Sequence, residues 1–160
     1  ASRFKELSDL FNKAAARGKL AEARILYPKV LEVCPTDRRR QMVFTMLKAF
    51  AKAGKHGQAL AWLKGCGFPP TRESVGKVMN SAVKSGNVTA AEEAFDWACE
   101  VLPTQKYDLP MWGMLVDAYA RRKSWVKVEE AIQRMKDEGV RPDLVFYNVL
   151  MMRYGKAKKH

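Results

Sequence analysis

A short turn recurs along this 160-residue chain at nearly regular intervals. Residues 16–19, 52–55 and 84–87 share a glycine at their third position, residues 121–124 take the same place without it, and residues 154–156 begin a fifth copy. Glycine readily adopts the left-handed conformation that closes a helix, so each copy predicts a helix, a tight turn and a second helix. Equivalent positions from the second copy onwards lie 32, 37 and 35 residues apart. The sequence therefore predicts repeats of one helical hairpin.

Helix-breaking residues separate one copy from the next. They are Pro35, Pro69 with Pro70, Pro103 and Pro142, each followed by Thr or Asp within two residues. Proline cannot continue a helix, and Thr or Asp can cap the helix that follows. We expect one array over residues 1–160, with repeats at about 4–38, 39–71, 72–108, 109–143 and a truncated 144–160.

The first helix of every copy carries one apolar stripe with a three, one, three spacing. The stripes are Leu7, Leu10, Phe11 and Ala14; Val43, Met46, Leu47 and Phe50; Val75, Val78, Met79 and Ala82; Trp112, Leu115, Val116 and Tyr119; and Tyr147, Leu150, Met151 and Tyr154. A single helix of this kind is marginally stable, and stacked repeats bury the stripes against one another. The pattern predicts an all-α solenoid of about four and a half helix-turn-helix repeats with one continuous core.

The charge of the chain favours a polyanionic partner. Lys and Arg number 29 against 17 Asp and Glu, which gives a net charge of +12. A surplus of this size attracts phosphates or acidic surfaces, although it also occurs as a solubilising surface. No window approaches 18 uninterrupted apolar residues, so we expect no membrane insertion. No apolar signal segment opens the sequence.

No catalytic, metal or cofactor site is expected. Cys34, Cys66 and Cys99 are spaced about one repeat apart without a CxxC pair, so we interpret them as packing residues. No glycine-rich phosphate loop is present, and His56 lies in a predicted turn away from any nucleophile. We expect a binding protein rather than an enzyme.

Residues 129–150 resemble a pentatricopeptide repeat running into the next one. The shared features are Met135, the turn at 136–139, the Pro142-Asp143 ending and the Tyr147-Asn148 opening. The resemblance is sharp over 109–155, clear over 40–108 and weak over 4–38. It implies a right-handed superhelix that binds single-stranded RNA along its concave face, about one base per repeat, in a mitochondrion or plastid.

The tetratricopeptide repeat, a protein-binding family of similar period, is the alternative. That family usually has glycine or another small residue four positions before the aromatic of the first helix. This chain has Met46, Leu115 and Leu150 at those positions. The sequence therefore favours the pentatricopeptide repeat.

The resemblance implies that one residue early in each first helix reads a base together with the last residue of the repeat. The early positions are Ser8, Phe44, Gly76, Gly113 and Asn148, and the last positions are Asp37 or Arg38, Thr71, Asp108 and Asp143. The neighbours that would sandwich the base are Lys5, Gln41, Glu73, Pro110 and Val145. Gly76 and Gly113 carry no hydrogen-bonding group and Phe44 can only stack. We therefore expect weak or no sequence readout.

A row of cations is the stronger signal. Lys52, Lys84, Arg121 and Lys156 take equivalent places at the end of four first helices, where the family directs a lysine towards the RNA backbone. Cations spaced by one repeat can follow phosphates whatever the bases are. The competing interpretation is that Lys and Arg at a helix C-terminus complement its dipole. Further basic clusters occur at 38–40, 121–123 and 156–159.

Two functions are carried forward. The first is a single-stranded RNA-binding module acting in organellar RNA processing, stability or translation. The second is a structural scaffold subunit of a large organellar complex, such as a ribosome, polymerase or membrane energy complex, that binds protein or structured RNA. The truncated last repeat would expose Val149, Leu150 and Met152. We therefore expect a longer array, or a partner that covers this end.

Overall fold

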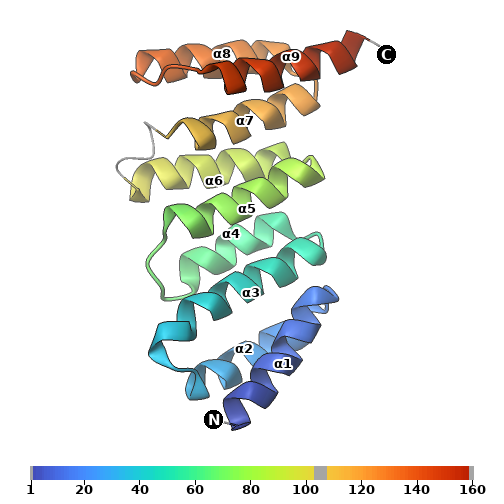
Figure 1. Ribbon diagram of the computed structural model, residues 1–160, viewed down its shortest axis with the longest axis vertical. Helices are drawn as coiled ribbons and strands as arrows, with labels where there is room; N and C mark the ends of the chain where they lie inside the picture. Colours follow the sequence, from blue (N-terminus) through green and yellow to red (C-terminus); the bar gives the residue numbers. More distant parts are fainter. Residues whose placement is uncertain (1, 103–107, 159–160) are drawn as a thin grey trace. The chain divides into compact units, whose positions relative to one another are not determined.

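The computed structural model describes residues 2–102 and 108–158, and the regular structure of this part is helical throughout (Figure 1). The predicted breaker at Pro103 lies outside these residues. The α-helices are α1 (Ser2–Ala16), α2 (Leu20–Val33), α3 (Arg39–Lys52), α4 (His56–Gly65), α5 (Arg72–Ser85), α6 (Val88–Val101), α7 (Leu109–Arg121), α8 (Trp125–Asp137) and α9 (Leu144–Lys158), and a 3-10 turn, η1, covers Thr36–Arg38. The all-α prediction is confirmed.

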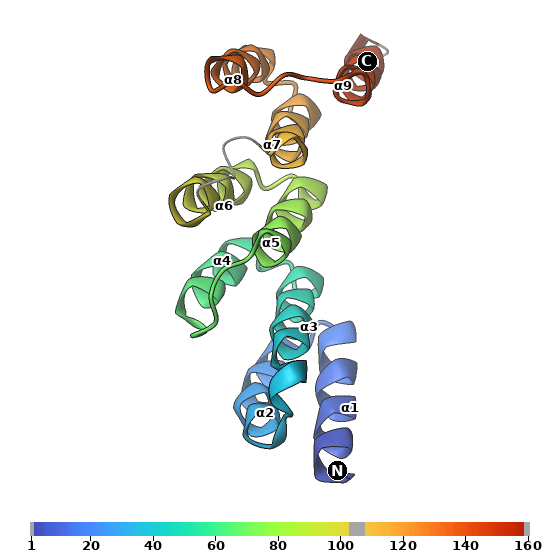
Figure 2. The same ribbon diagram turned by 60° about the vertical axis from the view of Figure 1, so that its left-hand side comes forward.

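The chain divides into two compact units, Ala1–Pro70 and Thr71–His160. In the first unit, α1 packs on α2 and α3, and α3 packs on α4. In the second unit, α5 packs on α6 and α7, and α7 packs on α8 and α9. The first helices α5, α7 and α9 of this unit therefore pack in succession, and α6 and α8 both lie on one side of them (Figure 2). This is the expected helical-hairpin repeat, while the repeat boundaries themselves stay a prediction.

The recurring turns close the first helices as the sequence predicts. Gly86 has φ 79°, and the N–H of Asn87 behind it donates to the carbonyl of Ala82 at 2.9 Å. Lys123 occupies the same conformation in the copy without glycine, at φ 58°, and Ser124 donates in the same way to Tyr119 at 3.0 Å. A non-glycine residue is disfavoured there because its Cβ crowds the backbone. The left-handed backbone and the hydrogen bond that follows it therefore define this turn, whether or not the residue is glycine.

The predicted stripes form the core of α3, α5 and α7. All four stripe residues are buried in each of these helices. The prediction is wrong for Leu10 in α1 and for Tyr147 and Met151 in α9, which are exposed. Among the described first helices, α1 packs only on α3 and α9 only on α7, so one side of each stripe has no helix to cover it. In α9 the buried aromatic is Phe146 instead.

In the second unit, three arginines form contacts between one first helix, or its capping residue, and the next first helix. Arg72 pairs with Asp108, Arg122 donates to the carbonyl of Gly86 at 2.8 and 3.0 Å, and Arg153 donates to Asp117 at 2.8 Å. Each contact joins residues that are 36 positions apart, which is one repeat. These side chains hold α5, α7 and α9 in register. No helix of the described chain has the length and apolarity needed to cross a bilayer.

Candidate nucleic-acid interface

Charge is divided between the first and second helices of the Thr71–His160 unit. Helix α5 carries three basic residues and one acidic residue, and α9 carries three basic residues and no acidic one. The second helix α6 has the opposite character, with four acidic residues and no basic one: Glu92, Glu93, Asp96 and Glu100. In the other unit, α3 carries four basic residues and no acidic one. Positive charge therefore predominates on α3, α5 and α9 and negative charge on α6, while α7 and α8 carry equal numbers of basic and acidic residues.

The members of the predicted cation row differ in their exposure and in their contacts with other protein groups. Lys52 ends α3 and is exposed, and in the second unit Lys84 and Lys156 are exposed on α5 and α9. Arg121 ends α7 and is paired through Nε with Oδ2 of Asp117 at 3.1 Å. The position of Lys84 and Arg121 in a last helical turn also suits the helix dipole. Their contact with phosphate stays a prediction.

Three of the last-position candidates, Thr71, Asp108 and Asp143, act as helix N-caps. Thr71 accepts from the N–H of Ser74 at 3.1 Å in a reciprocal capping box. Asp108 accepts from Met111 at 3.3 Å and is also paired with Arg72. Asp143 accepts from Phe146 at 2.8 Å. The proline-then-Thr/Asp pattern predicted the caps at Thr71 and Asp143, but not the one at Asp108. The cap predicted after Pro35 is wrong, because the 3-10 turn η1 intervenes and α3 begins after Arg38 without a side-chain cap. Capping engages the same oxygens that base reading would need.

The early-position candidates offer few groups for hydrogen bonding. The Ser8 hydroxyl donates to the Lys5 carbonyl one turn earlier at 3.1 Å, and Phe44 is half-buried. A Cβ added at Gly76 would meet nothing within 4 Å. Asn148 is exposed on α9, as is Asp37 in η1. Base reading at these positions stays a prediction.

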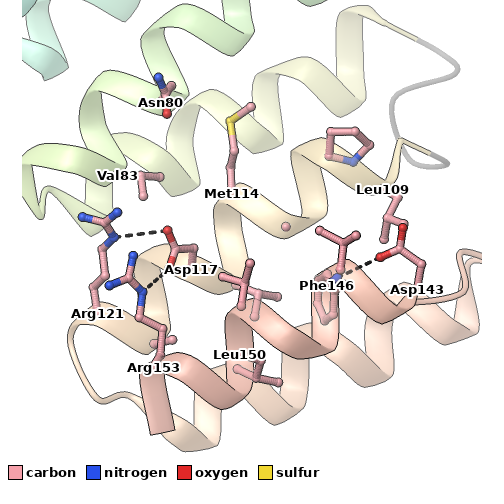
Figure 3. A pocket seen from close by; sticks show the side chains of 16 residues that line it. Asn80, Val83, Leu109, Met114, Asp117, Arg121, Asp143, Phe146, Leu150 and Arg153 are labelled. Carbon is pink, nitrogen blue, oxygen red and sulfur yellow. Dashed lines mark hydrogen bonds and ion pairs between the residues drawn. The ribbon is translucent and has the colours of Figure 1, made fainter. Parts of the chain in front are cut away.

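A cavity of about 500 Å³ lies along α5, α7 and α9 (Figure 3). Five of the RNA-contact candidates from the sequence line it: Pro110, Gly113, Arg121, Asp143 and Val145. Most of the remaining wall is apolar and comes from all three first helices. The absence of a side chain at Gly113 leaves room there, because an added Cβ would already touch Phe146 at 3.8 Å. A flat apolar group of the size of a nucleobase fits a wall of this kind.

One end of the cavity is charged, which the sequence did not indicate. Asp117 accepts from Arg121 on one oxygen and from Arg153 on the other, at 3.1 and 2.8 Å (Figure 3). The Arg153 side chain is only 17% exposed. The sequence patterns did not identify Asp117 and Arg153, because neither residue belongs to the recurring turn. The signal that could have found them is their separation of one repeat, on the same face of successive first helices.

A second polar pair, Tyr119 with Glu92, lies between α7 and α6. The hydroxyl of Tyr119 on α7 donates to Glu92 on α6 at 2.7 Å. Burial, and then this hydrogen bond, raise the pKa of Tyr119 well above its usual value of 10. The phenol is therefore neutral at physiological pH and serves to join α7 to α6.

Comparisons with known proteins agree with the repeat pattern. The family model described as a pentatricopeptide repeat domain matches residues 105–157. A chloroplastic pentatricopeptide repeat-containing protein of Arabidopsis thaliana is 32% identical over 95 residues, which is 58% of this chain and 12% of that relative. A mitochondrial one from the same plant is 25% identical over 119 residues, covering 74% of this chain and 24% of the relative.

A second chloroplastic relative from Arabidopsis thaliana is 30% identical over 91 residues, which is 52% of this chain and 18% of the relative. The chain thus spans less than a quarter of the length of each of these relatives. The matched residues include the Pro142-Asp143 ending and the Tyr147-Asn148 opening that carry the sequence resemblance. Hairpin architecture, repeat period and sequence matches point the same way: residues 105–157 match the pentatricopeptide repeat domain, and the chain is similar to pentatricopeptide repeat-containing proteins.

Proposed function

We propose that this chain is a single-stranded RNA-binding module that acts in organellar RNA processing, stability or translation. The observation that carries the proposal is the division of charge, with cations on the first helices and carboxylates on α6. A polyanion is attracted to one face and repelled from the other. The family generally acts in organellar RNA processing, and its proteins are generally not enzymes. The relatives are named chloroplastic or mitochondrial, which assigns this chain to a plastid or mitochondrion by family resemblance.

Sequence readout by these repeats is weak or absent in this proposal. Gly76 and Gly113 offer no side-chain donor or acceptor, and Thr71 and Asp143 each use an oxygen to cap a helix. Affinity then comes from phosphate contacts and from stacking against apolar surface, neither of which depends strongly on the base. RNA of mixed sequence is the expected ligand.

The decisive experiment compares two variants with the same loss of charge. In the first, Lys52, Lys84, Arg121 and Lys156 are changed to Gln. In the second, four cations of the second helices are changed to Gln: Lys29, Lys64, Lys127 and Lys136. Binding of a labelled single-stranded RNA pool is titrated across salt concentration.

The wild type is expected to show a log-log salt slope of about −2 to −3, because four phosphate contacts contribute roughly −0.7 each. The first variant should lose most of this slope and the second should keep it. Equal loss in the two variants would show that only net charge matters. Salt-independent binding by the wild type would contradict the proposal outright.

An exposed apolar face on α9 favours the scaffold as a second candidate. Leu144, Val145 and Met151 are 74, 68 and 69% exposed. Scattered surface apolar residues are common, but three on one helix are typical of a surface that a partner covers. This candidate predicts that Leu144→Gln with Met151→Gln, two changes outside the cavity lining that add no charge, releases the chain from an organellar assembly in a sucrose gradient. The RNA proposal predicts that the first-helix charge variant is released instead.

A further inference from the structure

Arg121 and Arg153 lie next to each other at the charged end of the cavity. They bind the two oxygens of one carboxylate, that of Asp117, and they come from successive first helices, α7 and α9 (Figure 3). Two guanidinium groups around a single carboxylate leave one positive charge uncompensated. A second anion placed against both groups would be attracted, because it neutralises this surplus in a partly desolvated site.

The hydrogen-bonding capacity of the two arginines points the same way. Each guanidinium has five N–H donors, and each uses Nε to reach Asp117. Within residues 2–102 and 108–158, no hydrogen bond or ion pair engages the Nη atoms of either residue. The planar guanidinium binds phosphate oxygens in a bidentate manner through such atoms.

The burial of Arg153 distinguishes it from the exposed lysines of the row. Its side chain is 17% exposed and is fixed by the 2.8 Å contact with Asp117. A cation held in place loses less conformational freedom on binding than an exposed lysine does. The rest of the same cavity is an apolar wall that includes Gly113 and Val145.

We propose that Arg153 and Arg121 together form a subsite for one phosphodiester of the bound RNA, with the neighbouring base against the apolar wall of the cavity. This inference rests on the proposed function and adds Arg153 to the residues that bind RNA. Asp117 holds the two guanidinium groups in place and is not itself a ligand of the RNA.

Three single variants test the subsite by RNA binding across salt concentration. Arg153→Gln removes one of the two cations, so its salt slope should fall by about 0.7 in magnitude relative to the wild type. Asp117→Asn weakens the same contacts but keeps both cations, so its salt slope should be no smaller than that of the wild type. Lys136→Gln, an exposed cation of α8, controls for net charge and should leave the slope unchanged.

The Asp117→Asn variant separates binding from structure. If Arg153 only docks α9 onto α7, Asp117→Asn and Arg153→Gln should reduce the salt slope alike, and that result would overturn the inference. A normal slope in Arg153→Gln, combined with loss of slope in the Lys52, Lys84, Arg121 and Lys156 variant, would also overturn it. The proposed function would stand in that case.

Arginine Nε–H NMR signals provide an independent measurement. Single-stranded RNA should shift the signals of Arg121 and Arg153 but not that of Arg122, whose Nε is bonded to the Gly86 carbonyl. If the wild type binds no RNA, the proposed function fails and RNA is not the ligand. Inorganic phosphate then decides whether an anion subsite exists: shifts confined to Arg121 and Arg153 would support it, and unshifted signals would overturn it.

Discussion

Lys123 shows how a single residue departs from the repeat and what the departure costs. It holds φ 58° at a turn where Gly18, Gly54 and Gly86 hold φ of 69 to 79°. The left-handed region costs an ordinary L-residue about 1 kcal/mol relative to glycine. The structure thus carries local strain at the turn between α7 and α8, where the sequence lacks the expected glycine.

Replacing Lys123 by glycine should therefore stabilise the protein. We expect Lys123→Gly to raise the free energy of unfolding by about 1 kcal/mol, because relief of the strain exceeds the added freedom of the unfolded chain. Urea unfolding followed by circular dichroism measures this. An unchanged or lower stability would show that the backbone at this turn is not strained.

Gly18 is the matched opposite case. Its φ is 69°, and a Cβ there would lie 3.0 Å from the carbonyl oxygen of Lys52. Gly18→Ala should destabilise the protein by about 1–2 kcal/mol, since the backbone strain is joined by a steric clash. The same urea unfolding measurement applies, and a stability equal to that of the wild type would contradict the account of this turn.

At the level of the helix, Asp143 is both a helix cap and a candidate base-reading residue. It caps α9 by accepting from Phe146, and it also lines the cavity. Asp143→Ala should lower the free energy of unfolding by about 1 kcal/mol through loss of the cap. Asp143→Asn keeps an acceptor for the Phe146 N–H, so its stability should remain close to that of the wild type.

The same Asp143→Asn variant tests whether this position reads a base. An amide presents different donors and acceptors from a carboxylate, so a base-reading residue would change the base preference. We expect the relative affinities for the four homopolymeric RNAs to remain unchanged, measured by competition at one salt concentration. A shift in their order would show that Asp143 reads sequence.

Helices and hairpins were predictable to a large extent because their signals are local. Proline followed by Thr or Asp marks the starts of α5 and α9, and the glycine turns mark the ends of α3 and α5. The charged end of the cavity was not predictable in this way. Asp117 and Arg153 meet only because α9 packs on α7, and that contact depends on the packing of the hairpins.

Over the whole molecule, packing also decides where pattern and burial disagree. The stripe spacing is the same in α7 and α9, yet Trp112 is fully buried and Tyr147 is 40% exposed. A periodic apolar stripe indicates which side of a helix can be buried, and the presence of a neighbouring helix determines whether that side is buried. We likewise propose that RNA lies along the first helices of the Thr71–His160 unit and away from the acidic second helix α6.

Site-specific photocrosslinking tests this claim most directly. A photoreactive amino acid is placed at Asn80, an exposed residue of α5 that lines the cavity, or at Glu93, an exposed residue of α6. With single-stranded RNA at moderate salt, we expect crosslinks from position 80 and background levels from position 93. Equal crosslinking at the two positions, or stronger crosslinking from position 93, would contradict binding on the first-helix face.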